Sequence, residues 1–354
     1  MLTKSLKING LKEVYPIIQG GMGVGVSRSS LAGSVAREDG IGIISTAQIG
    51  YDEPEFEKRP IETNLKAIKK HIVKAKEIAE GNGLIGVNIM VATKQYADYV
   101  QAAAKAGADV IISGAGLPVD LPKYVEGYES KIAPIVSSVK AANVILKMWD
   151  RKYKRIPDFL VIEGPKAGGH LGFAKEQLDD IENLNYEEEI KGIITAKKNY
   201  EEKYAKPIPV ITAGGIFDYK DICRQLELGA DGVQIATRFV VTKECDASDR
   251  YKQAYIDAKK EDIKITISPV GMPGRAIGNA FIEHVKGERV PIKKCFQCLE
   301  KCNPNETPYC ITKALVNAVK GDLDHGLIFC GAEVDRLHEM TTVHDLMMEL
   351  IGQK

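Results

Sequence analysis

His170 is the histidine of this sequence best placed for proton transfer. It lies in the glycine-rich stretch 164–172, directly after a short apolar run that ends at Glu163. An imidazole titrates near neutral pH, so a histidine on a loop beside a ligand can accept or hold a proton. A solvated loop histidine is the alternative. The other five histidines lie on a lysine-rich helix face or in the C-terminal quarter, where surface or packing roles are the simpler interpretation.

Four more loops that could hold a ligand follow other short apolar runs. Glycine has no side chain, so the backbone amides of such loops can approach a ligand closely and bind phosphate. Five such loops on one rim favour a large, planar, phosphorylated cofactor, whereas any one alone could be a tight turn. The phosphate is predicted at the amides of Gly214, Gly215, Ala236 and Thr237. The four loops are residues 19–23, 113–116, 213–215 and 236–237.

Four cysteines lie within a short stretch near the C-terminus. Thiolates this close in sequence are natural ligands of a tetrahedral zinc ion or an iron–sulfur cluster. The spacing matches neither the common zinc ribbon nor a ferredoxin, and reduced packing or surface thiols are the alternative. Two other cysteines, Cys223 and Cys330, are interpreted as core residues. The candidate metal ligands are Cys295, Cys298, Cys302 and Cys310.

Eight short apolar runs must position these loops. Most are continuously hydrophobic, as expected for strands of a parallel sheet that is buried on both faces. Helix-length segments separate them; residues 61–80, for example, place apolar side chains along one stripe and end at Gly81. The predicted strands are residues 16–19, 42–45, 84–90, 109–113, 132–136, 159–163, 209–213 and 232–235.

This alternation predicts an α/β fold, a (β/α)8 TIM barrel over residues 1–262. A doubly wound open sheet is the alternative, because sequence alone cannot show closure. An inserted segment, residues 164–205, follows the sixth strand and carries a charged helix at 186–204. In a barrel, the loops after the strands form one functional rim.

Residues 263–354 are predicted to form a C-terminal extension of the barrel domain. A long loop or lid is expected over 263–289, where Arg275 could meet an anionic group, although a solvated arginine is the alternative. The cysteine-rich segment follows, and then helices that begin near Thr307 and Thr342, both of which are favourable capping residues.

Composition excludes several classes of protein. The chain has 354 residues, with 48 Lys plus Arg balanced by 48 Asp plus Glu, which argues against nucleic acid as a partner. No apolar run is long enough for a membrane span, and the N-terminal residues lack the apolar core of a signal peptide. We therefore expect a cytoplasmic protein with reduced thiols.

The ordered set of motifs resembles the FMN-dependent nitronate monooxygenases, formerly called 2-nitropropane dioxygenases. The flavin-dependent enoyl-acyl-carrier-protein reductases of the same superfamily share most of it. The resemblance covers roughly residues 10–285. Two positions differ from the usual pattern: Ala236 stands where glycine is commoner, and Pro165-Lys166 stands where the reductases more often have Met-Glu. The motifs lie at residues 16–22, 86–90, 163–172, 211–216 and 232–239.

The resemblance implies a barrel with FMN at its C-terminal rim and His170 as the catalytic histidine. Gly20, Gly21 and Met22 would then lie against the flavin ring, with Asn88 and Gln234 nearby. Gly169, Gly214, Gly215 and Thr237 would line the ribityl phosphate. Ser113, Gly114, Gly168, Ala213 and Ala236 complete the predicted cofactor-binding set.

The resemblance implies oxidation of alkyl nitronates, small-molecule substrates, to carbonyl compounds and nitrite, with His170 as base. An enoyl-thioester reductase that uses FMN and a nicotinamide donor is the alternative, and the basic helix face at Lys66, Lys69, Lys70, Lys74 and Lys76 could meet an acidic carrier protein. A second alternative is a non-catalytic flavin- or metal-binding redox sensor, motivated by the cysteines. A homodimer is one oligomeric arrangement left open.

Overall fold

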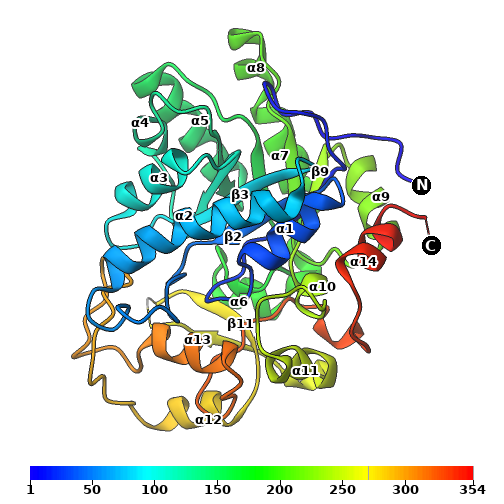
Figure 1. Cartoon of the computed structure of the whole chain (residues 1–354). Coiled ribbons are helices and arrows are strands. Elements are labelled where there is room, and N and C mark those ends of the chain that lie inside the picture. Colours follow the sequence, from blue (N-terminus) through cyan, green and yellow to red (C-terminus); the bar gives the residue numbers. More distant parts are fainter. Residues whose placement is uncertain (270, 354) are drawn as a thin grey trace.

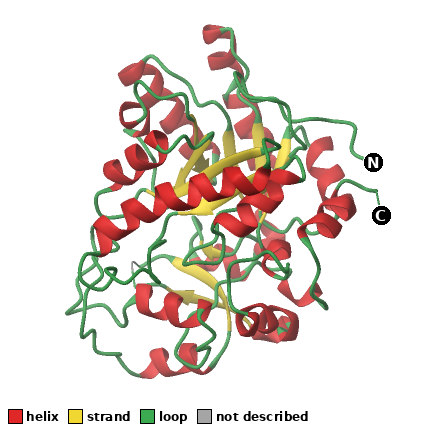
Figure 2. Ribbon diagram, in the orientation of Figure 1, coloured by secondary structure: helices red, strands yellow, loops and turns green. Residues whose placement is uncertain are grey.

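The strands close into a barrel. Eight parallel strands follow one another around it, and β9 pairs with β1. This closure confirms the predicted barrel and excludes the open sheet. The computed structural model describes residues 1–269 and 271–353, and Figures 1 and 2 show the strands surrounded by helices. The barrel strands, in order, are β1 (Ile17–Gln19), β2 (Ile41–Ser45), β3 (Leu84–Met90), β4 (Val110–Gly114), β5 (Lys131–Val136), β6 (Leu160–Glu163), β8 (Val210–Ala213) and β9 (Gly232–Ile235).

Apolar side chains fill the barrel interior and also cover its outer face. Along β2, Ile43 belongs to the inner cluster, whereas Ile44 belongs to the outer cluster beneath the helices. Successive residues of a strand face opposite sides, so a strand buried on both sides must be apolar throughout. Gly86 on β3 leaves room for the interior packing, because a Cβ there would lie 2.3 Å from Val110 Cγ2.

Helices cover the outside of the barrel. The longest, α2 (Pro60–Ala79), begins with proline at its first position and ends at Glu80, whose φ of 53° is left-handed. It buries Ile68 and Ile72 against the strands. The other helices are α1 (Ser29–Arg37), α3 (Tyr96–Lys105), α4 (Leu121–Tyr124), α5 (Val139–Tyr153), α6 (Lys175–Asp179), α7 (Tyr186–Ala196), α8 (Lys198–Tyr204), α9 (Tyr219–Glu227), α10 (Thr237–Val240), α11 (Asp249–Asp257), α12 (Ala280–Gly287), α13 (Ile311–Val319) and α14 (Val343–Leu350).

The prediction of a loop over residues 263–289 was wrong. β10 (Ile263–Ile267) and β11 (Pro273–Ile277) form an antiparallel pair, and β11 also pairs with the short strand β7 (Gly169–His170). The three strands lie below the barrel in Figure 2. The alternation of Ile263, Ile265 and Ile267 with polar residues is a strand pattern, which the nearby prolines and glycines obscured. α12 occupies much of the remaining segment.

Two helix boundaries also differ from the predictions. The charged helix predicted at 186–204 is divided at Lys197 into α7 and α8. The helix predicted near Thr307 begins only at Ile311, because Thr307 donates its amide to the Asn303 carbonyl and closes a turn there. The last helix is as predicted: the Thr342 side chain accepts a 3.0 Å hydrogen bond from the Asp345 amide at its N-terminus.

The C-terminal helix returns to the first helix of the barrel. Leu346 and Leu350 of α14 share an apolar cluster with Leu31 and Val35 of α1, and the two helices lie side by side in Figure 1. Within residues 1–269 and 271–353, every helix is too short or too polar to cross a lipid bilayer.

Candidate active site

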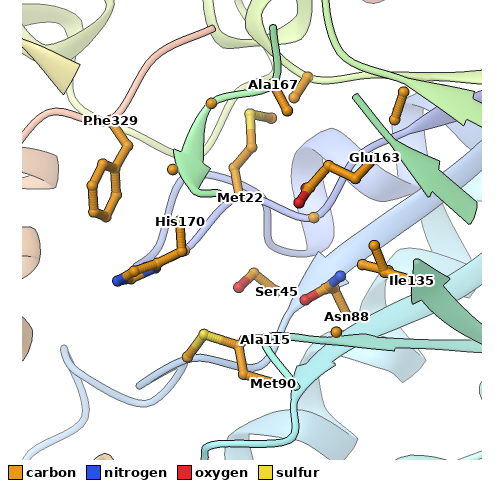
Figure 3. A pocket seen from close by; sticks show the side chains of 18 of the residues that line it. Met22, Ser45, Asn88, Met90, Ala115, Ile135, Glu163, Ala167, His170 and Phe329 are labelled. Carbon is orange, nitrogen blue, oxygen red and sulfur yellow. The ribbon is translucent and has the colours of Figure 1, made fainter. Parts of the chain in front are cut away.

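A large cavity opens at the C-terminal ends of the barrel strands. Its volume is about 470 Å³, within the usual range for sites of small ligands. Loops after β1, β3, β4, β6, β8 and β9 line it, together with residues 329–333 from the C-terminal extension. Figure 3 shows Met22, Asn88, Glu163 and His170 around this space. The position is the one that barrels use for catalysis.

The barrel brings nearly all of the predicted site residues to this cavity. His170 lines it, as do the predicted cofactor-binding residues apart from Ser113. Placing Ser113 in that set is not supported, because its hydroxyl bonds the Ile89 carbonyl and Tyr96 at 2.7 Å each. The residues assembled are Gly20, Gly21, Met22, Asn88, Gly114, Gly168, Gly169, Ala213, Gly214, Gly215, Gln234, Ala236 and Thr237.

At one side of the cavity, the loop after β1 lies close to the ends of β3 and β9. A Cβ on Gly21 would lie 2.5 Å from Asn88 Cβ, and one on Gly20 would lie 3.2 Å from Gln234 Cγ. Only glycine permits the first approach. Gln19 secures the loop, because its side-chain oxygen accepts a 3.1 Å hydrogen bond from the Ile43 amide. The loop therefore borders the cavity mainly with backbone, and Asn88 and Gln234 lie beside it.

Another part of the cavity is built from glycine turns that lie close to the C-terminal extension. Gly214 and Gly215 have φ values of 96° and 76°, in the left-handed region that favours glycine. A Cβ on Gly214 would lie 2.8 Å from the Ala167 amide nitrogen. Across this space, the Gly331 amide donates a 3.1 Å hydrogen bond to Thr237 Oγ1. Turns of this kind, with successive backbone amides near a cavity, are the type that can bind an anion.

The imidazole of His170 borders the cavity without a polar partner. Its Nε2 is buried and makes no hydrogen bond. The ring centroid lies 5.1 Å from that of Phe329, at an interplanar angle of 59°, and Figure 3 shows the two rings as neighbours. Burial lowers the pKa of His170 to about 4. The imidazole is therefore neutral at pH 7, and a neutral imidazole can accept a proton.

Glu163, the last residue of β6, is a site residue that the sequence reasoning missed. Its carboxyl group points into the cavity in Figure 3, and burial raises its pKa to about 7. Tyr186 holds the strand end by donating a 2.8 Å hydrogen bond to the Glu163 carbonyl. The available signal was an acidic residue closing an otherwise apolar run, directly before the glycine loop. Its titration near neutral pH marks it as a functional candidate.

Comparison with known proteins agrees with this geometry. The family model described as nitronate monooxygenase matches residues 4–353. The chain belongs to the nitronate monooxygenase family. It is 27% identical over 301 residues to a probable nitronate monooxygenase of Staphylococcus saprophyticus, covering 78% of this chain and 80% of that protein. A probable nitronate monooxygenase of Staphylococcus aureus strain Newman is 28% identical over 306 residues, covering 80% and 79%. The chain is therefore an oxidoreductase.

Solved structures show the same fold. FabK from Thermotoga maritima superimposes with a TM-score of 0.72 at 24% identity, covering 96% of this chain and 92% of that one. Nitroalkane oxidase from Streptomyces ansochromogenes gives a TM-score of 0.69 at 18% identity, covering 95% and 96%. At identities this low, the structural similarity shows that the proteins share the barrel fold.

The metal site predicted at the cysteines gains no support from the structure of this family member. Among the described residues, no group of three or more His, Cys, Asp or Glu side chains is arranged to hold a metal ion. All four candidate ligands are free thiols, and Cys298 lines the cavity. Burial raises the pKa of Cys298 to about 11, which opposes the thiolate form that binds metals. The alternative of a non-catalytic redox sensor was motivated by a metal site at these cysteines, and that site has no support from the structure.

Three other side chains differ from their predicted roles. Arg275 is only 3% exposed and donates to the Ala167 carbonyl, so it supports the loop before His170 instead of meeting a ligand. His71 is buried rather than on the lysine-rich surface, and its Nδ1 lies 3.0 Å from Ser29 Oγ. Cys330 is a core residue as predicted, whereas Cys223 is only half-buried.

Proposed function

We propose that this chain binds FMN in the cavity and oxidises alkyl nitronates to carbonyl compounds and nitrite, with molecular oxygen as the oxidant. The observation that carries the proposal is that one cavity combines glycine walls with the unpartnered Nε2 of His170. The first feature suits a flat phosphorylated cofactor, and the second suits proton transfer to or from a small substrate.

The residues present fit FMN. A side chain at Gly21 would collide with Asn88 and one at Gly214 with Ala167, so both loops require glycine to pack as they do beside the cavity. The buried Oε1 of Gln234 has no hydrogen-bond partner, and it can accept from a ring N–H of the kind that a flavin carries. The amides of Gly214, Gly215, Ala236 and Thr237 would hold the phosphate. Gly20, Gly21, Met22, Asn88 and Gln234 would border the ring.

When bound, FMN supplies the redox chemistry, while the protein supplies orientation and proton transfer. His170 Nε2 can accept the proton from the α-carbon of a neutral nitroalkane, because the imidazole is uncharged at pH 7. Phe329 packs beside this ring and limits its movement. Once it has accepted the proton, the imidazolium can stabilise the negative charge of the nitronate that forms.

Glu163 adds a charge that depends on pH. Near pH 7 the carboxyl group is partly protonated, since burial raises its pKa to about 7. In the protonated form it can donate a hydrogen bond to a nitro oxygen, whereas the ionised form repels a nitronate anion. We infer that the protonated form of Glu163 is the one that favours nitronate binding.

A paired assay tests this function. Flavin-loaded protein is given ethyl or propyl nitronate in air, and nitrite release is measured. The same preparation is given crotonyl thioester and a nicotinamide donor without oxygen, and loss of the donor absorbance is followed. Nitrite release without thioester reduction is expected. Protein that remains colourless with added FMN, or that releases no nitrite, would contradict the proposal.

Enoyl-thioester reduction is the second candidate, and the apolar wall of the cavity favours it. Met90 and three apolar residues of the C-terminal extension, Leu299, Ile311 and Leu315, share one cluster and line the cavity, which suits an acyl chain longer than a small nitronate. The basic helix face gives little support, because Lys66, Lys70 and Lys76 each pair with a carboxylate within 2.8 Å. Thioester reduction with the nicotinamide donor in the paired assay would establish this alternative.

A further inference from the structure

Lys166 lies beside the glycine turns that are proposed to hold the cofactor phosphate. It belongs to the loop after β6, and its side chain covers Gly215. Three of its side-chain carbons would lie within 3.4 Å of a Cβ added to that glycine, and the nearest would be 2.8 Å away. Its carbonyl oxygen accepts a 3.1 Å hydrogen bond from the Ala332 amide. The side chain is 44% exposed, so its ammonium group can turn while the loop stays in place.

Lys166 is also the one lysine or arginine among the described residues that line the cavity. Glu163 and Glu333 line it as well. A phosphate dianion at the amides of Gly214 and Gly215 would share this cavity with Glu333, whose carboxylate lies 3.2 Å from Lys166 Nζ. Two negative groups in one cavity oppose binding unless a cation lies between them. Lys166 is the side chain in reach that can provide this cation.

Glu333 has a second cationic partner. One of its oxygens pairs with Lys166 Nζ, and the other lies 3.6 Å from Arg336 Nη1. Arg336 in turn donates a 2.9 Å hydrogen bond to Asp218. If Lys166 turned towards a phosphate, Glu333 would still be paired with Arg336. The network therefore lets the lysine change partners without leaving an unpaired carboxylate.

Building on the proposed function, we propose that Lys166 contacts the phosphate of bound FMN and that Glu333 competes with this phosphate for the lysine. The interaction is then specific to the phosphorylated flavin. Riboflavin has the same ring and ribityl chain but no phosphate, so it provides the matched probe.

The test titrates flavin-free protein with FMN and with riboflavin, and follows the quenching of flavin fluorescence to obtain Kd. The variants are Lys166→Met, which keeps an apolar stem of similar length, Lys166→Arg, which keeps the charge, and Glu333→Gln. Lys69→Met on α2 is the control, because Lys69 is an exposed lysine that does not line the cavity. Each titration is repeated at low and high salt.

For Lys166→Met we expect FMN binding to weaken by about tenfold or more, since a charge-assisted hydrogen bond is lost, and riboflavin binding to stay unchanged. Lys166→Arg should keep the wild-type affinity for FMN, and Glu333→Gln should bind FMN more tightly. The salt dependence of FMN binding should be smaller in Lys166→Met than in the wild type. Equal weakening of both flavins, or unchanged FMN binding, overturns this inference and leaves the proposed function standing. Wild-type protein that binds neither flavin overturns both.

Discussion

His170 lies directly opposite Gly274 in the antiparallel pairing of β7 with β11. The strand that holds the candidate catalytic histidine is therefore positioned by a strand from outside the barrel. Gly274 also faces Phe329, since a Cβ added to it would lie 2.9 Å from Phe329 Cε1. Phe329 in turn packs on the His170 ring. The C-terminal extension thus sets the position of the imidazole through both backbone pairing and side-chain contact.

Gly274→Ala is expected to disturb this arrangement. The added methyl group must displace the Phe329 ring, which packs against His170, and a small misplacement of a catalytic group lowers its efficiency. We expect kcat to fall by about tenfold with FMN affinity unchanged. Gly287→Ala in α12 is the control, because a Cβ there meets no atom within 4 Å. Equal kcat values for the two variants would show that the Gly274–Phe329 contact is unimportant.

His170→Asn tests the imidazole itself. Asparagine keeps a polar side chain of smaller size but cannot accept a proton near neutral pH. We expect turnover of a neutral nitroalkane to fall by about 100-fold or more, while FMN stays bound. Steady-state kinetics and the visible absorbance of the purified variant measure the two effects. An undiminished rate would remove His170 from the mechanism.

Glu163→Gln should change the pH dependence of nitronate binding. The carboxyl group of the wild-type protein loses its proton as the pH rises through about 7, and the new negative charge repels the anion. KM for a preformed nitronate should therefore rise above pH 7 in the wild type and stay level in the variant. Glu176→Gln, at an exposed position of α6, should behave as the wild type does. If KM rises above pH 7 in Glu163→Gln as well, a group other than Glu163 causes the pH dependence.

Gly214→Ala should weaken flavin binding. A methyl group at this left-handed position would lie 2.8 Å from the Ala167 nitrogen, within the proposed phosphate-binding turn. We expect the affinity for FMN to fall by about tenfold or more, with the barrel still folded by circular dichroism. Gly81→Ala is a matched control: its φ of 83° is also left-handed, but a Cβ there meets open space. That variant should lose only about 1 kcal/mol of stability.

His71 should make the fold sensitive to acid. Burial lowers the pKa of His71 to about 4 from 6.5, so protons bind the unfolded chain more readily than the folded one. The stability that follows from this shift is present above pH 6.5 and is lost as the pH falls from 6.5 towards 4.

His71→Asn keeps a side-chain amide for Ser29 and removes the titration. Urea unfolding at pH 7.5 and pH 5.0 should show a smaller loss of stability between the two conditions in this variant than in the wild type. His338→Asn, at an exposed position, should lose as much as the wild type does. Identical losses in all three proteins would exclude His71 as a source of the acid sensitivity.

Much of the fold could be predicted from the local sequence pattern. The eight apolar runs predict parallel strands because a strand buried on both faces cannot alternate with polar residues. The predicted strand over residues 84–90 coincides with β3 (Leu84–Met90). The glycine loops could be assigned to a common rim for a similar reason, since the C-terminal ends of parallel barrel strands lie on one side. Local composition is enough for such inferences because each depends on neighbours in the chain.

Other features arise only when distant segments meet. Nothing near Arg275 in the sequence indicates that its guanidinium reaches the Ala167 carbonyl, and nothing near His71 places it beside Ser29. The same holds for Glu163, whose raised pKa comes from its burial in the folded chain. Desolvation and cross-strand pairing depend on which surfaces come together in the folded chain. The chemical state of this site is therefore a property of packing, whereas the barrel that carries it follows from local pattern.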